Sequence, residues 1–371
     1  MPDASNAQAV LPEVFINGRF LTQRVTGVQR YARETLQCLD ELLAEGAGEF
    51  ARWTLLTPAG VEAPSLKRIR VEAVGRLKGH AWEQIELAWR AKKGLLFSFA
   101  FTGPFSLRRQ IVTVHDAAVV RIPAAYNWRF RLWYRSLIAR IVSRAPRTVA
   151  VSRFSAGEAS ACFGAPAARV RVSTEGWQHL DRVVADSAIL DQHGLRDKPF
   201  ALAVSSPTPN KNFAAIAQAL RLLGPDAPCV AVAGSADLSV FRGGEDPASD
   251  AIVKLGFVSD AQLKALYLHA TCFVMPSFYE GFGIPPLEAM SCGCPVIAST
   301  APAIREVCGD AALYFDPHRP QELAQQLKTL FADAALADRM SQDGLLRAEG
   351  YSWKESARLN LAVVREAQCG A

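Results

Sequence analysis

The segment PSFYEGFGIPPLEAM, residues 276–290, holds two carboxylates, Glu280 and Glu288, eight positions apart. Its adjacent prolines fit the first turn of a helix, which puts Glu280 in the preceding loop and Glu288 about one turn inside. Even along one continuous helix, their Cα atoms would be about 12 Å apart, too far for a shared proton. Gly281 and Gly283 let the backbone approach a ligand closely. The spacing therefore favours two contacts along one elongated ligand over a paired-carboxylate acid/base site.

Three further polar groups follow predicted strands. His115 comes at the end of IVTVHD, residues 111–116, and Lys211 lies in SSPTPNKN, near the first turn of a helix. A cation there opposes the helix dipole unless an anion binds beside it. The loop before Gly27 also opens onto a helix N-terminus, although it lacks G-x-G-x-x-G spacing. Because ligands of doubly wound sheets lie at the carboxyl ends of strands, all three are candidates. A satisfied buried imidazole, an exposed lysine and an ordinary turn remain the alternatives.

Several common kinds of site are missing from the sequence. Cys292 and Cys294 lack zinc-ligand spacing and a second ligand pair. Neither Asp-x-Asp nor a G-x-S-x-G nucleophile elbow occurs, which argues against a chelated divalent metal and a serine hydrolase. We expect no bound metal and no cofactor. The eight cysteines form no framework, no signal peptide is apparent, and no run reaches the roughly 18–20 apolar residues of a spanning helix. These features indicate reduced thiols and a cytoplasmic protein.

Short β-rich runs alternate with helical patterns along the chain, which is typical of repeated βα units and a parallel sheet. The runs are continuously apolar, as expected for parallel strands that are buried on both faces. The predicted strands cover residues 13–18, 52–58, 111–116, 148–152, 170–176, 200–206, 229–234, 252–257, 271–277, 295–299 and 312–315.

At 371 residues the chain exceeds the usual limit for a single core. We therefore predict an α/β fold of two doubly wound, Rossmann-like domains that face a cleft. The first domain would span residues 1–180 and the second residues 181–351. A final helix within residues 352–371 would pack back on the first domain.

Charge is distributed unevenly between the two halves. Residues 1–185 carry 26 Lys/Arg against 15 Asp/Glu, a net charge of +11, whereas the remainder carries −6. The run 121–147 holds seven arginines, several aromatic residues and no acid. It could be a helix with a solvated arginine face and an aromatic core face. Alternatively, it could dock on an anionic membrane, where each cation near the surface adds about 1 kcal/mol. Nucleic acid is less favoured, since no recognisable binding motif accompanies the charge.

With these residues considered together, the chain resembles the family 4 retaining glycosyltransferases of the GT-B fold over nearly its whole length. The segment EGFGIPPLEAMSCGCPVIAS is similar to the family's E-x7-E segment, and LGFVSDAQLKALYLHATCFVMPS precedes it as in the family. The stretches INGRFLTQRVTGVQRYARE, VHD and SWKESARLNLAVVRE resemble the branch that builds bacterial exopolysaccharide and O-antigen chains.

The resemblance implies roles for the E-x7-E segment in binding the donor. Glu288 would hold the ribose hydroxyls of a nucleotide. Glu280 would hydrogen-bond hydroxyls of the donor sugar and contribute to catalysis, with the backbone of Gly281, Phe282 and Gly283 beside the sugar and diphosphate. Catalysis would lie in positioning and charge stabilisation, because the family has no firm protein nucleophile.

The resemblance also implies roles outside that segment. Lys211 would neutralise the diphosphate leaving group, and His115 would contact the donor sugar near the reacting carbon. The loop at Thr26 and Gly27 would face the diphosphate and the acceptor. Many members carry an arginine where Ser206 stands here, so Lys211 would neutralise more of the diphosphate charge alone.

By the same resemblance, the first domain would bind the acceptor and the second domain the nucleotide sugar. The expected reaction is metal-independent, retaining transfer of a hexose, with GDP-mannose preferred over UDP-sugars, GDP-fucose or dTDP-rhamnose. The acceptor would be a saccharide on polyprenyl diphosphate at the cytoplasmic face of the inner membrane. A nucleotide-sugar epimerase or hydrolase of the same fold is the rival enzyme. A non-catalytic subunit that binds a nucleotide sugar is the rival from another class.

Overall fold

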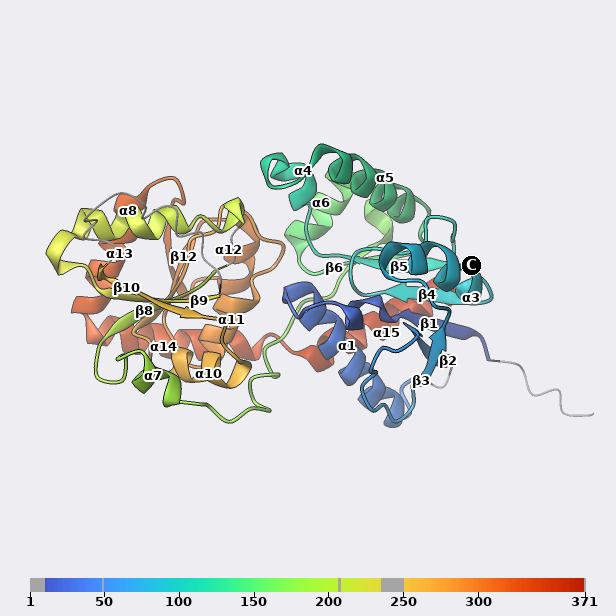
Figure 1. Cartoon of the computed structure of the whole chain (residues 1–371), viewed down its shortest axis with the longest axis horizontal. Coiled ribbons are helices and arrows are strands. Elements are labelled where there is room, and N and C mark those ends of the chain that lie inside the picture. The colour runs from blue at the N-terminus through green and yellow to red at the C-terminus, as the bar shows by residue number, and fades with distance from the viewer. Residues whose placement is uncertain (1–10, 49, 206–207, 235–249, 370–371) are drawn as a thin grey trace, which may run out of the picture.

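The computed structural model describes residues 11–48, 50–205, 208–234 and 250–369, which form two α/β domains side by side (Figure 1). The first domain is built on a seven-stranded sheet in the order β3-β2-β1-β4-β5-β6-β7, in which all neighbouring strands are parallel. Its strands are β1 (Glu13–Asn17), β2 (Arg52–Pro58), β3 (Arg70–Val74), β4 (Leu95–Ser98), β5 (Gln110–Val114), β6 (Thr148–Ala150) and β7 (Val170–Val172).

Helices connect these strands and cover the sheet. The α-helices are α1 (Gly27–Ala44), α2 (Gly79–Trp82), α3 (Ala88–Ala91), α4 (Ala118–Arg121), α5 (Trp128–Arg144) and α6 (Arg153–Phe163). The π-helical turn η2 (Glu83–Leu87) joins α2 to α3. The 3₁₀ helices are η1 (Gly18–Thr22), η3 (Pro123–Ala125) and η4 (Ala167–Arg169).

The second domain has a six-stranded sheet in the order β10-β9-β8-β11-β12-β13, again with parallel neighbours. Its strands are β8 (Phe200–Ser205), β9 (Cys229–Gly234), β10 (Ile252–Gly256), β11 (Cys272–Met275), β12 (Val296–Ser299) and β13 (Ala312–Phe315). Its helices are α7 (Ala188–Gln192), α8 (Phe213–Leu223), α10 (Asp260–His269), α11 (Ile284–Ser291), α12 (Pro302–Cys308), α13 (Pro320–Ala332) and α14 (Ala334–Glu349), with 3₁₀ turns η5 (Pro209–Lys211) and η6 (Gly224–Asp226). The two parallel sheets confirm the predicted α/β fold class.

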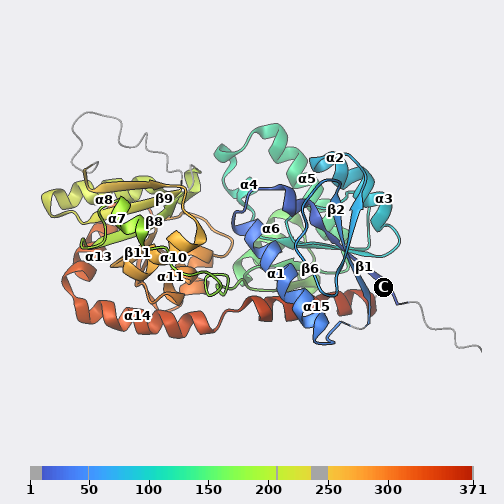
Figure 2. The ribbon, with the colours of Figure 1, turned by 60° about the horizontal axis from the view of Figure 1, so that its bottom comes forward.

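The last helix, α15 (Trp353–Cys369), returns to the first domain and packs against α1, in line with α14 along one side of the molecule (Figure 2). Asn360 donates to the hydroxyl of Tyr31 on α1 at 2.9 Å, and both side chains are buried. Glu366, also on α15, is ion-paired to Arg147 and Arg171 of the first domain. The C-terminal helix is therefore tied to the domain formed by the N-terminal half of the chain.

The two chain segments that cross between the domains are bonded to each other. The indole N–H of Trp177 donates to the carbonyl of Ala348 at 2.8 Å. The side chain of Gln178 donates to the carbonyl of Tyr351 and accepts from the backbone N–H of Trp353. A Cβ atom at Gly176 would lie 2.4 Å from the Trp353 nitrogen, so only glycine allows this approach.

Helix α5 differs from the predicted arginine-and-aromatic arrangement. Its buried residues are aliphatic: Leu137, Ile138, Ile141 and Val142. The aromatic side chains of its first two turns are partly exposed, 64% for Trp128 and 41% for Phe130. They stack on one another, with Phe130 5.3 Å from Tyr134 between ring centroids, and of these rings Tyr134 packs against the aliphatic core. The core face of α5 is therefore mainly aliphatic, and not aromatic as predicted.

Two other observations concern the whole chain. All eight cysteines are free thiols. Among the described residues, no helix is both long and apolar enough to span a bilayer.

Candidate functional site

The loop between β11 and α11, residues 276–283, carries Glu280 and touches the first domain directly. The carbonyl of Gly281 accepts hydrogen bonds from the hydroxyls of Ser152 at 2.6 Å and Ser155 at 2.8 Å. A Cβ atom at Gly281 would lie 1.8 Å from the carbonyl oxygen of His115. We predicted that this glycine lets the backbone approach a ligand. In the structure the close approach is to the other domain, because the loop inserts against the end of β5.

Tyr279 fixes the same loop from the other side. Its hydroxyl accepts from the backbone N–H of Ala117 at 2.8 Å and donates to the carboxylate of Glu158 at 3.1 Å. Glu158 is held in turn by a bidentate pair with Arg121 at 2.7 and 2.6 Å. These bonds place Glu280 at the junction of the two domains.

Glu280 and Lys211 form an ion pair. The ammonium of Lys211 lies 2.8 and 3.0 Å from the two carboxylate oxygens, and the side chains are 26% and 13% exposed. Asn210, next to the lysine, accepts from the backbone N–H of Phe278 and donates to the carbonyl of Tyr279. We predicted separate roles for the two charges, at the diphosphate and at the sugar. The structure brings the two side chains into direct contact, so an anion bound here would interact with a lysine that is already ion-paired to Glu280.

Two helix N-termini meet where the loop of residues 276–283 leads into α11. Gly27 is the first residue of α1, and Ile284 is the first residue of α11. A Cβ atom added to Gly27 would lie 3.7 Å from the δ-methyl group of Ile284. Thr26 caps α1, and its backbone N–H donates to the side chain of Gln29 at 3.3 Å. Gly283 precedes α11 with φ +122°, a conformation that favours glycine. Both N-termini carry the positive end of a helix dipole, which attracts anions.

His115 lies where the sequence predicted, directly after β5, and its imidazole is buried. Its Nε2 is 2.8 Å from the carbonyl of Phe99, so this nitrogen carries the proton and donates. Its Nδ1 faces the carboxyl of Glu175 at 3.6 Å. Burial raises the pKa of Glu175, although His115 partly offsets that rise. Both ring nitrogens therefore face protein groups, and contact with a donor sugar stays a prediction.

Asp116 is a neighbour of this site that sequence reasoning left unassigned. Its carboxylate accepts from the backbone N–H of Ala118 at 2.7 Å. Burial raises the pKa of Asp116, and the negative charge of nearby Glu280 raises it further. A carboxyl group with a raised pKa thus lies close to the Lys211–Glu280 pair.

Glu288 lies inside α11 and is buried in a network that the sequence did not reveal. His179 Nε2 donates to one carboxylate oxygen at 2.8 Å, and the hydroxyl of Tyr267 donates to the other at 3.0 Å. The indole N–H of Trp353 donates to His179 Nδ1 at 3.2 Å. Burial raises the pKa of Tyr267, and the adjacent carboxylate raises it further. A carboxylate has about four lone-pair directions, so Glu288 can still accept further hydrogen bonds.

The remaining predicted residues are placed as follows. Phe282 is buried, with its ring 5.7 Å from that of Tyr351 in an edge-on arrangement. Ser206 lies outside the described residues. Within the described ranges, no group of three His, Cys, Asp or Glu side chains has the geometry to hold a metal ion.

Comparisons with known proteins bear on the family of the chain. Residues 94–176 match the family described as Glycosyltransferase Family 4, and residues 186–347 match Glycosyl transferases group 1. The chain is 33% identical over 270 residues to the O-antigen chain mannosyltransferase B of Escherichia coli, a match that covers 68% of each protein. The chain belongs to glycosyltransferase family 4. It is therefore a glycosyltransferase, as the resemblance implied.

Solved structures show that this family 4 glycosyltransferase has the GT-B fold. Sucrose-phosphate synthase from Thermosynechococcus elongatus superposes with a TM-score of 0.74 at 18% identity, covering 97% of this chain and 100% of that one. The HepE protein of Anabaena, solved in complex with UDP and glucose, gives a TM-score of 0.67 at 18% identity, covering 95% and 98%. Both neighbours confirm the predicted fold.

Proposed function

We propose that this glycosyltransferase transfers mannose from GDP-mannose to a polyprenyl-diphosphate-linked saccharide in cell-surface polysaccharide synthesis, with retention and without a bound metal. The observation that carries the proposal is the ion pair between Lys211 and Glu280, since Glu280 lies on the loop that leads into α11, whose N-terminus meets that of α1. The choice of mannose is supported by the name of the Escherichia coli relative.

The diphosphate of the donor binds at the two helix N-termini, where backbone N–H groups and the helix dipoles attract its charge. The ammonium group of Lys211 then donates hydrogen bonds to both Glu280 and the leaving phosphate. Stabilising charge that develops on the leaving group typically contributes about 10²–10³-fold in rate per donor group. Glu280, released in part from the lysine, accepts hydrogen bonds from hydroxyl groups of the mannose.

Glu288 holds the ribose through the lone pairs that His179 and Tyr267 leave free. Because these two donors orient the carboxylate before the nucleotide arrives, binding loses little side-chain entropy. Catalysis then rests on positioning and on charge stabilisation, and no protein nucleophile is required.

The first test is calorimetry of GDP, UDP and dTDP binding, with and without magnesium, on wild type and Glu288→Ala. We expect GDP alone to bind, without a magnesium requirement. A charge-assisted hydrogen bond contributes about 1.5–3 kcal/mol, so Glu288→Ala should weaken GDP binding by about 10–100-fold. Glu288→Gln, which keeps an acceptor for Tyr267, serves as the conservative control. Failure of all three nucleotides to bind would overturn the assignment of this site.

Location at the cytoplasmic face of the inner membrane forms part of the proposal, and helix α5 is the proposed contact. It carries Arg129, Arg131 and Arg135, and its first residue, Trp128, is 64% exposed. Aromatic rings suit the headgroup region, and arginines attract anionic lipids. A triple substitution of the three arginines by glutamine should abolish sedimentation with phosphatidylglycerol-containing vesicles. Retained binding would count against α5 as the contact surface.

A further inference from the structure

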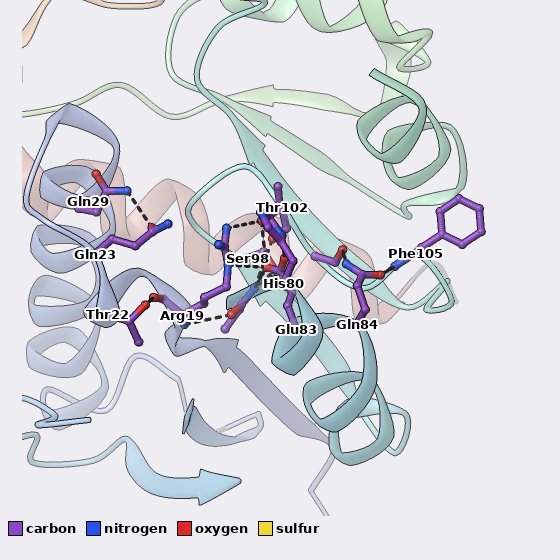
Figure 3. Close-up of polar contacts among 12 residues, drawn as sticks. Arg19, Thr22, Gln23, Gln29, His80, Glu83, Gln84, Ser98, Thr102 and Phe105 are labelled. Atoms are coloured by element: carbon purple, nitrogen blue, oxygen red, sulfur yellow. Dashed lines mark hydrogen bonds and ion pairs between the residues drawn. The ribbon is translucent and has the colours of Figure 1, made fainter. Parts of the chain in front are cut away.

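A buried polar network lies at the ends of β1 and β4, apart from the groups assigned above (Figure 3). Its centre is Glu83, which is completely buried. One carboxylate oxygen accepts from the amide of Asn17 at 2.9 Å, from Arg19 Nε at 3.1 Å and from the hydroxyl of Thr102 at 2.9 Å. Arg19 also donates to the Thr102 hydroxyl at 2.6 Å. Burying such an ion pair gives little net stability compared with apolar residues of similar volume.

His80 is the exposed member of this network. Its Nδ1 lies 3.1 Å from the second oxygen of Glu83, and its side chain is 41% exposed. Burial by itself would raise the pKa of Glu83, but the hydrogen bond from His80, the charge of Arg19 and the bond from Asn17 together lower it. An ionised Glu83 cannot donate, so Nδ1 carries the proton. In the neutral ring, Nε2 is then a hydrogen-bond acceptor, and no described residue bonds to it.

The backbone around the network is held in unusual conformations. Glu83 begins the π-helical turn η2, a feature that is frequent at functional sites. Phe101 has φ +60°, which is rare for a bulky side chain. Gln84 bridges the same loop, donating to the carbonyl of Gly103 at 2.9 Å and accepting from the N–H of Phe105 at 2.8 Å (Figure 3). The loop that follows β4, which supplies Thr102 to the network, thus contains a strained backbone position at Phe101.

Aromatic rings connect His80 to the site at His115. The imidazole of His80 meets the indole of Trp133 edge-on, with centroids 4.6 Å apart. Phe101 lies 5.2 Å from His115 and 5.8 Å from Tyr134, and Tyr134 lies 6.3 Å from Trp133. Strands β1, β4 and β5 are neighbours, so their carboxyl ends share one edge of the sheet. A half-exposed indole beside a free hydrogen-bond acceptor suits a pyranose, which has an apolar face and hydroxyls at its rim.

We infer that His80 and Trp133 bind the acceptor saccharide, with His80 Nε2 accepting a hydrogen bond from a sugar hydroxyl and the indole packing on the sugar's apolar face. Glu83 acts through His80 as a positioning residue. This inference rests on the proposed function and names the acceptor side of the same site.

The test measures transfer from GDP-mannose to octyl α-D-mannopyranoside, together with GDP binding and hydrolysis of GDP-mannose by water. Loss of one hydrogen bond corresponds to about a 5–10-fold change, so His80→Ala should raise the KM for the mannoside by about that factor. GDP affinity and hydrolysis should stay unchanged. Trp133→Ala should act in the same direction, whereas Trp89→Ala, a 66% exposed tryptophan on α3, should have no effect.

Two further variants test the roles of His80 and Glu83 separately, each compared with wild type at a temperature where both proteins are folded. His80→Gln supplies an amide oxygen in place of Nε2 and should recover part of the mannoside KM. Glu83→Gln should raise the same KM without changing GDP affinity. An unchanged KM in His80→Ala would overturn the inference, as would a wild type that hydrolyses GDP-mannose but transfers nothing to the mannoside. These outcomes can be distinguished from failure of the proposed function itself, because in that case the wild-type protein would not bind GDP.

Discussion

At the scale of single residues, charges in this protein are neutralised in pairs. Lys211 and Glu280 pair at 2.8 Å at the domain junction, and Arg19 and Glu83 pair at 3.1 Å in the buried network. Neither pair is freely solvated, so removing one partner leaves the other charge without compensation in a poorly solvated place. The two pairs nevertheless differ in function: the first adjoins the proposed diphosphate site, and the second orients His80.

Lys211→Met should lower kcat/KM for transfer by about 100-fold or more, because the leaving diphosphate loses its cation and Glu280 is left unpaired. Steady-state kinetics with GDP-mannose measure this loss. Lys254→Met, at an exposed lysine on β10, is the matched control and should match wild type. A loss smaller than about threefold in Lys211→Met would mean that other groups neutralise the diphosphate.

Glu83→Gln should destabilise the first domain by about 3–5 kcal/mol at neutral pH, because Arg19 is left as an uncompensated buried charge. The pKa of Glu83 lies below its ordinary value of 4.5, so its stabilising effect is fully present above that value. The effect disappears as the pH falls through the lower, folded-state pKa. Urea unfolding at several pH values should therefore show the gap between wild type and variant narrowing below about pH 4.5. A gap that stays constant on acidification would contradict this account.

At the scale of elements, the loop of residues 276–283 both carries Glu280 and joins the two domains. Its contacts come from α6 and from the segment after β5, through Ser152, Ser155 and Ala117. The position of Glu280 therefore depends on how closely the loop backbone approaches His115. A substitution of Gly281 at the domain junction would therefore also move Glu280.

Gly281→Ala should displace this loop, since its Cβ would lie 1.8 Å from the His115 carbonyl oxygen. We expect a stability loss of about 1–3 kcal/mol, as for other overpacked positions, together with a marked loss of transfer. Gly157→Ala on α6 has no atom within 4 Å of the new Cβ and should be neutral or slightly stabilising. Thermal unfolding and transfer assays on both variants measure the difference. Equal behaviour of the two would show that the loop adapts at little cost.

At the scale of the whole molecule, four kinds of contact set the relative position of the domains. The crossing segments are hydrogen-bonded through Trp177 and Gln178, and α15 lies on α1. Arg30 on α1 is ion-paired to Asp260 on α10 at 2.5 Å. The carboxylate of Glu306 on α12 accepts from the first backbone N–H groups of α6, at 2.8 and 3.0 Å.

Glu306→Gln should loosen the contact between α12 and α6, because an uncharged amide binds the helix N-terminus less strongly. Without nucleotide, X-ray scattering should then give a larger radius of gyration than for wild type. Glu355→Gln, at an exposed position on α15, is the control and should leave the radius unchanged. An identical scattering profile for Glu306→Gln would assign the domain arrangement to the other contacts.

The sequence by itself determined the parallel α/β domains and the strand-end positions of His115, Lys211 and Glu280, since apolar periodicity and helix-start signals are local. It did not predict β3 or β4. Strand β3 is an edge strand with a mostly exposed pattern, and β4 has only four residues, so neither gives a clear period.

Only the tertiary structure decided which side chains meet. His179 and Glu288 are 109 positions apart, and Glu280 pairs with Lys211 across 69 positions. His80 and Glu83 are close in the sequence, but Asn17, Arg19 and Thr102 reach Glu83 only through packing of separate strands and loops. Hydrogen-bond partners depend on distances and directions that packing sets, and no local pattern of residue types encodes them.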